Sequence, residues 1–253
     1  MNAHVPKLLA ASALITLGAC GDSTEPPAEN AQERQDLLTS VTDNVILPAY
    51  QRLVDNTAAL ATAAQAYASA VQTGEGLAER EAVQTAFTNA YSAMQYAELL
   101  QIGPYGPASK FEGGLNIRDE MYSWPVVNAC RVDQEIVSED FTGEDFFENS
   151  LVNVYGFDAL EYLLFYDSAE NSCPQPVSIN TDGSWAALST DMLRQRRAAY
   201  AARVAAQLAL EADRLQDSWT NGFAEELRRA GSGSGTYRST QAGLDAVFAS
   251  MFY

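Results

Sequence analysis

Helical spacing of apolar residues, sustained over most of the chain, is the feature that most limits its fold. From Gln32 to Val71 the apolar positions recur every three or four residues, alanine is frequent, and runs of β-branched residues are rare. Pro48 interrupts this segment, so a kink or a first break is expected there. Further helices are predicted between clusters of glycine and proline, over 77–101, 115–124, 126–137, 151–166, 185–230 and 237–253. The chain is therefore predicted to be all-α, with one or more bundles of long antiparallel helices.

The connections between these helices are predicted to be irregular. Residues 102–150 are rich in aromatic side chains, and 167–183 form a long loop. Asp182 or Ser184 is expected to cap the longest helix, because a short polar side chain can accept a hydrogen bond from a free backbone amide. The helical domain is expected to span 32–253. Its first bundle covers about 32–166, and a long-helix second part covers about 184–253.

Residues 1–19 have the three parts of an export signal. Lys7 supplies a positive charge, Leu8–Leu17 form an apolar run too short to cross a bilayer, and small residues follow. The sequence Leu17-Gly18-Ala19-Cys20 resembles a lipobox, so cleavage before Cys20 and a lipid on its thiol are expected. An ordinary signal peptide with a chance cysteine is the alternative. Residues 20–31 contain almost no large apolar side chain and are predicted to be a disordered tether.

The charge and the histidine content exclude several functions. The chain has 15 basic and 33 acidic residues, and removal of Lys7 with the signal leaves a net charge of −19. Such a charge argues against binding to nucleic acid and permits cations or basic partners. His4, the only histidine, lies in the signal. A histidine-liganded zinc peptidase and a Ser-His-Asp or Cys-His hydrolase are therefore excluded.

Two cysteines remain after the signal, Cys130 and Cys173. In an oxidising compartment such a pair commonly forms a disulfide, and this one would close a loop of about 44 residues. Two buried free thiols are the alternative, because spacing along the chain does not show that the Cα atoms come together.

Asp158 and Glu161 stand three residues apart in an otherwise apolar segment, so they share one face of a predicted helix. Burying two carboxylates is costly unless a metal ion, an arginine or a shared proton accompanies them. A salt bridge to Arg118 or Arg131 is the structural reading of this pair. A cation site in a polar space between helices is the functional one.

The stretch from Gly156 to Phe165 resembles the signature of the imelysin-like family, bacterial envelope proteins named after an insulin-cleaving membrane protease. The family pattern is Gly-x-His-x-x-Glu, and here Gly156 and Glu161 match while Asp158 replaces the histidine. Other segments resemble the family in the same order along the chain, namely 37–52, 95–104, 122–125, 131–133 and 196–219. The resemblance covers about residues 35–253.

The resemblance implies an all-helical fold of two packed bundles with a site between them. It also implies a relation both to peptidases and to periplasmic iron-uptake components, in which the motif residues are the supposed metal or functional groups. This chain departs from the pattern at Asp158, which removes a nitrogen ligand. It also ends where family members continue, so the second bundle is expected to be shortened.

Three functions are open at this point. The first is an envelope lipoprotein that binds iron, calcium or another hard cation, or a metal chelate, through oxygen ligands. The second is a metal-dependent peptidase with Glu161 as its base, and the third is a scaffold without catalysis. The lipid on Cys20 would attach the protein to a membrane, and Gly21 favours the outer one. The candidate metal ligands are Asp158, Glu161, Glu98 and Asp133, and the candidate binding residues are Gly156, Tyr122, Trp124 and Arg131.

Overall fold

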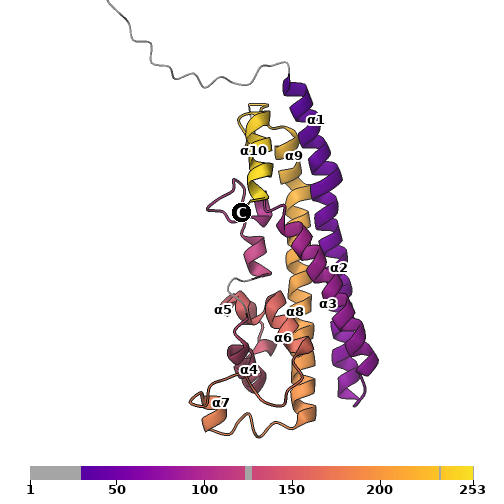
Figure 1. The fold of residues 1–253 in the computed structure, drawn as a ribbon, viewed down its shortest axis with the longest axis vertical. Coiled ribbons are helices and arrows are strands. Elements are labelled where there is room, and N and C mark those ends of the chain that lie inside the picture. Colours follow the sequence, from indigo (N-terminus) through magenta and orange to yellow (C-terminus); the bar gives the residue numbers. More distant parts are fainter. Residues whose placement is uncertain (1–29, 123–126, 234, 253) are drawn as a thin grey trace, which may run out of the picture.

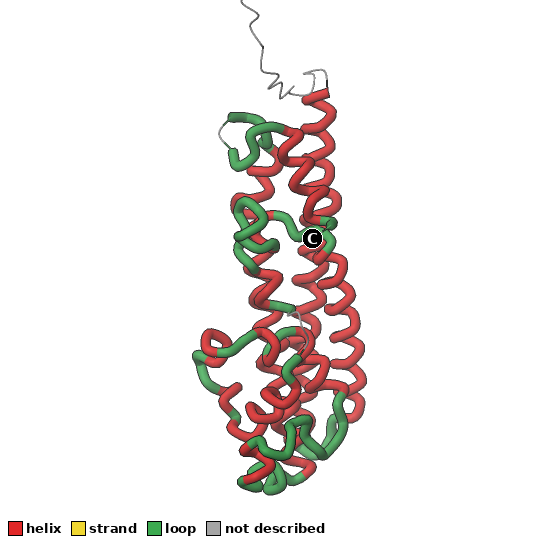
Figure 2. Tube along the Cα trace, turned by 60° about the vertical axis from the view of Figure 1, so that its left-hand side comes forward, coloured by secondary structure: helices red, strands yellow, loops and turns green. Residues whose placement is uncertain are grey.

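A computed structural model describes residues 30–122, 127–233 and 235–252 of the chain. Within these ranges the regular elements are all helices, and the prediction of an all-α fold is confirmed. The helices form an elongated bundle, seen from two sides in Figures 1 and 2. The predicted signal peptide, the lipidated Cys20 and most of the tether lie outside the described residues.

The first long helix runs without interruption past its proline. Helix α1 (Ala31–Val41) continues through a π-helical turn (Thr42–Ile46) into α2 (Leu47–Gln72). In this wide turn the amide of Leu47 bonds to the carbonyl of Thr42, five residues earlier. Pro48 follows at once, and a proline neither donates this bond nor tolerates the carbonyl four residues before it. The wider π-helical turn makes room for the proline ring, so the helix continues at Pro48, where a kink or a break was expected.

Helix α3 (Leu77–Glu98) returns along α2 as an antiparallel hairpin. Gly74 and Gly76 form the turn with positive φ angles of 84° and 115°. A Cβ on Gly76 would lie 3.1 Å from a methyl group of Val71, so glycine suits this turn in conformation and in space.

The other long helix, α8 (Thr190–Ser218), lies along α2. The side chain of Ser189 caps it by accepting a hydrogen bond from the amide of Met192. The predicted caps at Asp182 and Ser184 are therefore wrong, and the helix begins later than expected. A second π-helical turn (Trp219–Phe223) joins α8 to α9 (Ala224–Arg228).

The last described helix, α10 (Thr240–Ser250), lies beside α1 at the upper end of the bundle in Figure 1.

Shorter elements occupy the side of the bundle near α8. They are the helices α4 (Ala129–Ser138), α5 (Phe146–Asn149), α6 (Phe157–Phe165) and α7 (Ser178–Thr181), with 3-10 turns at Gly103–Tyr105, Ile117–Glu120, Asp140–Thr142 and Val152–Val154. The helices predicted over 115–124 and 151–166 are shorter than expected. The first is a 3-10 turn in its described part, and the second starts at Phe157.

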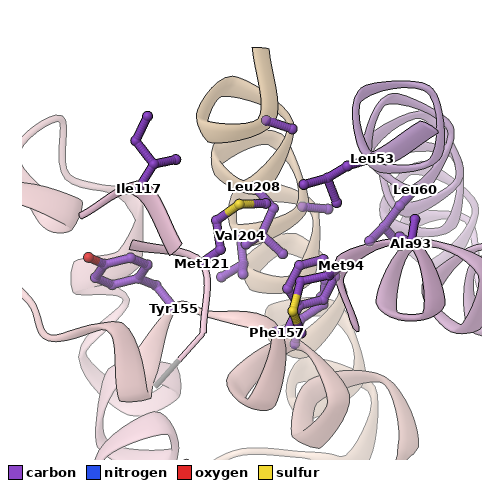
Figure 3. Packing of buried hydrophobic residues seen from close by; sticks show 14 of the residues in the cluster. Leu53, Leu60, Ala93, Met94, Ile117, Met121, Tyr155, Phe157, Val204 and Leu208 are labelled. Carbon is purple, nitrogen blue, oxygen red and sulfur yellow. The ribbon is translucent and has the colours of Figure 1, made fainter. Parts of the chain in front are cut away.

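The buried apolar residues form one cluster that includes side chains from both the first and the last third of the chain. Figure 3 shows Phe157 of α6 and Met121, which follows the 3-10 turn Ile117–Glu120, beside Val204 and Leu208 of α8, with Met94 of α3 nearby. All of these side chains are fully buried. The segments 32–166 and 184–253 thus share a core, because α8 packs on both α2 and α6.

The predicted disulfide is present between Cys130 and Cys173, whose Cα atoms lie 4.5 Å apart. It ties the start of α4 to the loop after α6. No helix in the described ranges is both long enough and apolar enough to span a bilayer.

Candidate functional site

Gly156 positions the helix that carries the two motif carboxylates. It directly precedes α6, and the amide of the next residue, Phe157, donates to the carbonyl of Met121 at 2.9 Å. A Cβ on Gly156 would lie only 2.8 Å from that same Met121 oxygen and 2.9 Å from the oxygen of Val152. Glycine is needed here because the backbone oxygens of two segments leave no space for a Cβ atom. Its role in the motif is thus to place α6, which in turn places the acidic side chains.

The two carboxylates of the motif differ in their surroundings. Asp158 lies in the first turn of α6 and is only 8% exposed, while Glu161, one turn later, is exposed. The Asp158 oxygen Oδ2 is buried and has no hydrogen-bond partner among the described residues. A buried carboxylate oxygen without a donor is costly, which makes Asp158 the least satisfied acid of this region.

The protonation of Asp158 reflects this environment. Burial raises the pKa of the Asp158 carboxyl from 3.8 to about 6, and the negative charge of Glu161 adds to the rise. Arg118 acts in the opposite direction, and Glu98 adds a smaller increase. Asp158 therefore changes charge near neutral pH, in a range where ligand binding can displace its proton.

Arg118 is the cation that acts on the pKa of Asp158, but two of its three guanidinium nitrogens are bonded to Glu98. Its Nε and Nη2 atoms donate to one oxygen of Glu98 at 2.8 and 2.6 Å. The guanidinium carbon lies 4.9 Å from the centre of the Tyr122 ring, and Nη1 also bonds to Asp119. Since these contacts use the guanidinium, no ion pair between Arg118 and Asp158 forms in the described part of the chain.

Tyr91 of α3 packs against α6 and against Tyr122. The ring of Tyr91 lies 5.7 Å from that of Phe157 and 6.3 Å from that of Tyr122. Burial raises the pKa of the Tyr91 hydroxyl, and Tyr122, Asp158 and Glu161 raise it further. The charges of both motif carboxylates thus act on the Tyr91 phenol. In the sequence, Tyr91 is one of several apolar and aromatic residues at helical spacing, and nothing in that pattern distinguishes it from a core residue.

Asp133 is not part of this site and has its own hydrogen-bond partners. It is fully buried on α4, where it accepts hydrogen bonds from the Tyr162 hydroxyl at 3.1 and 3.0 Å and from the Ser172 amide at 2.7 Å. Burial raises the pKa of its carboxyl, while these donors and Arg197 lower it. Its contacts thus hold the loop after α6 and give it a structural role.

Arg131 was expected as one possible salt-bridge partner of Asp158 and Glu161, but it contacts a different acid. Its Nη2 atom lies 2.5 Å from Glu135, one turn along α4, and Glu135 is almost completely buried. The cation beside Asp158 is therefore Arg118.

The last two predictions concern Trp124 and the metal ligands. Trp124, proposed as a binding residue, lies outside the described residues. Among those that are described, no three acidic, cysteine or histidine side chains come close enough to hold a metal ion by themselves. Of the four candidate ligands, Asp158, Glu161 and Glu98 share one neighbourhood with Arg118, and Asp133 is separate.

The fold and this motif define an all-helical class of protein, in which a helix that starts after a glycine carries one buried and one exposed acid on the side of a long bundle. The sequence model of the imelysin family matches residues 46–253, and the chain belongs to that family. The resemblance inferred from the motif is confirmed. No curated protein sequence matches the chain.

A solved structure supports the same fold. It is a protein of Parabacteroides distasonis described as a "putative iron-regulated protein A precursor", which superimposes with a TM-score of 0.61 at 14% identity. The alignment covers 88% of this chain and 57% of that one. The chain thus spans little more than half the length of this structural neighbour, and at this identity the likeness shows the fold.

Proposed function

We propose that this chain is an envelope lipoprotein of the imelysin family that binds a metal-bearing ligand at the site of Asp158 and Glu161. The observation that supports this proposal best is the buried, unsatisfied Oδ2 atom of Asp158, one helical turn before the Glu161 carboxylate. The Tyr91 ring packs on Phe157, the residue before Asp158. An all-oxygen group of this kind suits hard cations such as Fe³⁺. The description of the structural neighbour as iron-regulated makes iron the first metal to test.

A chelated metal fits these residues better than a bare ion. The described residues offer no group of three acidic, cysteine or histidine ligands, and Arg118 holds the nearest additional acid, Glu98. Hard cations in proteins take six or more oxygen ligands. Two carboxylates can complete the coordination of a metal whose other positions a small chelator fills. The same shortage of side-chain ligands disfavours the peptidase alternative, in which the protein itself must hold the metal while Glu161 acts as base.

The Asp158→Asn and Glu161→Gln variants are expected to weaken binding of ferric citrate by about tenfold or more each, because each replaces a charged ligand with a neutral one of the same shape. Isothermal titration at pH 7.5 measures this effect, with calcium, manganese and citrate alone as comparison titrants. Glu81→Gln is the matched control, since Glu81 is an exposed acid on α3. Equal affinity in all four proteins, or no binding of any titrant, would leave the motif with a structural role only.

The affinity of the wild-type protein is also expected to depend on pH. Because the pKa of Asp158 is about 6, ferric citrate has to displace its proton at lower pH. Binding should therefore weaken between pH 7.5 and pH 5, and the Asp158→Asn protein should lose most of that dependence.

The lipid anchor is a separate part of the proposal and has its own test. Cys20→Ala is expected to abolish both lipid attachment and membrane association, because the thiol is the attachment point. Labelled palmitate incorporation and membrane fractionation in a bacterial host measure the two effects. Cys130→Ala is a useful comparison, since it removes a cysteine outside the lipobox. A Cys20→Ala protein that still carries label in the membrane fraction would contradict the lipoprotein assignment.

A further inference from the structure

Two adjoining cavities are lined by residues of α2, of the α2–α3 turn and of the first turns of α8. In Figure 1 that turn and the start of α8 are at the lower end of the bundle. The inner cavity has a volume of about 100 Å³ and the outer one about 250 Å³. Both are lined by Tyr67, Arg80 and Arg194, so they are two parts of one hollow. This hollow is at the end of α6 opposite to Asp158.

The inner cavity is basic although the chain is strongly acidic. Arg80, Arg194 and Arg197 line it, and Asp167 is the one acid among the lining residues. Glu75 adds one acid at the outer cavity. The chain has 15 basic residues against 33 acidic ones, so its composition does not favour such a gathering of arginines. Three guanidinium groups around one small cavity are suited to an anion.

Arg197 is the least satisfied cation of this group. It is 8% exposed, and its Nη1 atom donates to the carbonyl oxygens of Ser168 at 2.9 Å and Tyr166 at 3.4 Å. Its Nε and Nη2 atoms are buried and have no hydrogen-bond partner among the described residues. Asp133 lies close enough for Arg197 to lower its pKa, but its hydrogen bonds go to Tyr162 and Ser172. The guanidinium carbon also lies 5.4 Å from the centre of the Tyr166 ring and 6.0 Å from that of Trp185. These rings stabilise the charge but accept no conventional hydrogen bond, so an anion in the adjacent cavity would supply the acceptor that the buried N–H groups lack.

The other two arginines are held at the surface. Arg80 makes two contacts of 2.8 Å with Asp167, whose side chain is 74% exposed, and it also bonds to the carbonyl of Leu164 at the end of α6. Arg194 is paired with Asp191 at 3.7 Å, and both side chains are well exposed. Exposed pairs of this kind contribute little to stability, so Arg194 is available to another anion.

Tyr67 and the start of α8 add neutral donors to the same place. Tyr67 is 7% exposed, and burial raises the pKa of its hydroxyl although Arg80, Arg194 and Arg197 each lower it. The hydroxyl therefore stays protonated and can donate a hydrogen bond. Thr190, the first residue of the 29-residue helix α8, also lines the cavity, and the positive end of the helix dipole favours an anion there.

We propose that this hollow is a second ligand site, which binds a small organic anion through a carboxylate or phosphate group. The charged group would lie among the arginines in the inner cavity. Leu163 and Leu193, which also line it, offer contact to a short apolar part of the ligand. This site does not depend on the metal-bearing ligand proposed for Asp158.

The test is a set of titrations of the full folded protein with inorganic phosphate, butyrate and the neutral analogue butyramide. Arg194→Gln is expected to weaken anion binding by about tenfold, and Tyr67→Phe is expected to weaken it by a smaller factor. Arg214→Gln is the matched control, because Arg214 lies on the same helix and is paired with Glu211 three residues before it, as Arg194 is with Asp191. Asp158→Asn should bind the anions like the wild type.

The probes also identify the ligand class. Preference for phosphate indicates a phosphorylated ligand, preference for butyrate a carboxylate, and equal binding a general oxyanion site. Arg197→Gln is expected to reduce binding most strongly. If that protein does not fold, the Arg194 and Tyr67 variants still decide the outcome. Absence of saturable binding at millimolar concentrations, binding of butyramide as tight as butyrate, or equal losses in Arg194→Gln and Arg214→Gln would overturn the proposal.

Discussion

Removal of the disulfide is expected to lower the free energy of unfolding by about 4 kcal/mol, since an unfolded chain without the bond regains the freedom of a loop of about 44 residues. Cys130 and Cys173 are 43 positions apart in the sequence, and the loop between them contains α5 and α6 as well as Asp158 and Glu161. Urea unfolding followed by circular dichroism, on the wild type and on the Cys130→Ser/Cys173→Ser double variant, measures the difference.

The reduced wild-type protein is the control for this comparison. It lacks the bond but keeps both sulfur atoms, so it should match the double variant if the constraint on the unfolded chain is the main effect. The far-UV spectra of the folded proteins should agree, because α2, α3 and α8 lie outside the closed loop. A difference in unfolding free energy below about 1 kcal/mol would mean that the unfolded chain is little constrained by the bond.

The second large effect is the pH dependence caused by Asp158. The pKa of this carboxyl is about 6 in the folded protein against an ordinary value of 3.8. Between these two values the folded protein retains a proton that the unfolded chain releases, so stability falls as pH rises through this window. The Asp158→Asn protein has no such group. Its stability relative to the wild type should therefore increase by about 2 kcal/mol between pH 4.5 and pH 7.5.

Comparison across pH separates this effect from any constant effect of the amide. Urea unfolding at several pH values gives the difference between the two proteins, and only its change with pH is interpreted. Glu81→Gln, at an exposed position on α3, should show no comparable change. Glu161→Gln should show part of the effect, because the charge of Glu161 contributes to the raised pKa of Asp158. A pH-independent difference for Asp158→Asn would show that the carboxyl has an ordinary pKa.

The long helices could be predicted from the sequence because their signals are local. The turn at Gly74 and Gly76 and the disturbance at Pro48 both appear where the residues indicate them. The shorter elements depend on distant contacts. The helix expected from residue 151 begins only after Gly156, because that glycine packs on the backbone of Met121.

The start of α8 was also decided by tertiary structure. Asp182 and Ser184 have the chemistry of a helix cap, but the chain turns after them so that the indole of Trp185 donates to the carbonyl of Ala169 at 2.9 Å. The helix then begins at the next suitable polar residue, Ser189. When a distant contact fixes the chain before a helix, the local sequence does not show which of several polar residues will cap that helix.

The sequence predicted the candidate site only in part, because the burial of each acid depends on tertiary packing. Helical spacing placed Asp158 and Glu161 near one face, but residues three apart differ by about 60° around the axis, and the boundary of the core falls between them. Asp158 is therefore buried and Glu161 exposed. Tyr162, one residue further round the helix, points to Asp133, which explains why that acid is apart from the others.

The packing of α8 on α2 has a consequence for the order of folding. The end of α2 and the start of α8 are separated by more than a hundred residues, whereas α2 and α3 are joined by a four-residue turn. Contacts between near neighbours in the sequence form quickly, and distant ones form slowly. The α2–α3 hairpin is thus expected to exist early with one apolar side still open to water. Aggregation during refolding should therefore depend on how quickly α8 covers that side.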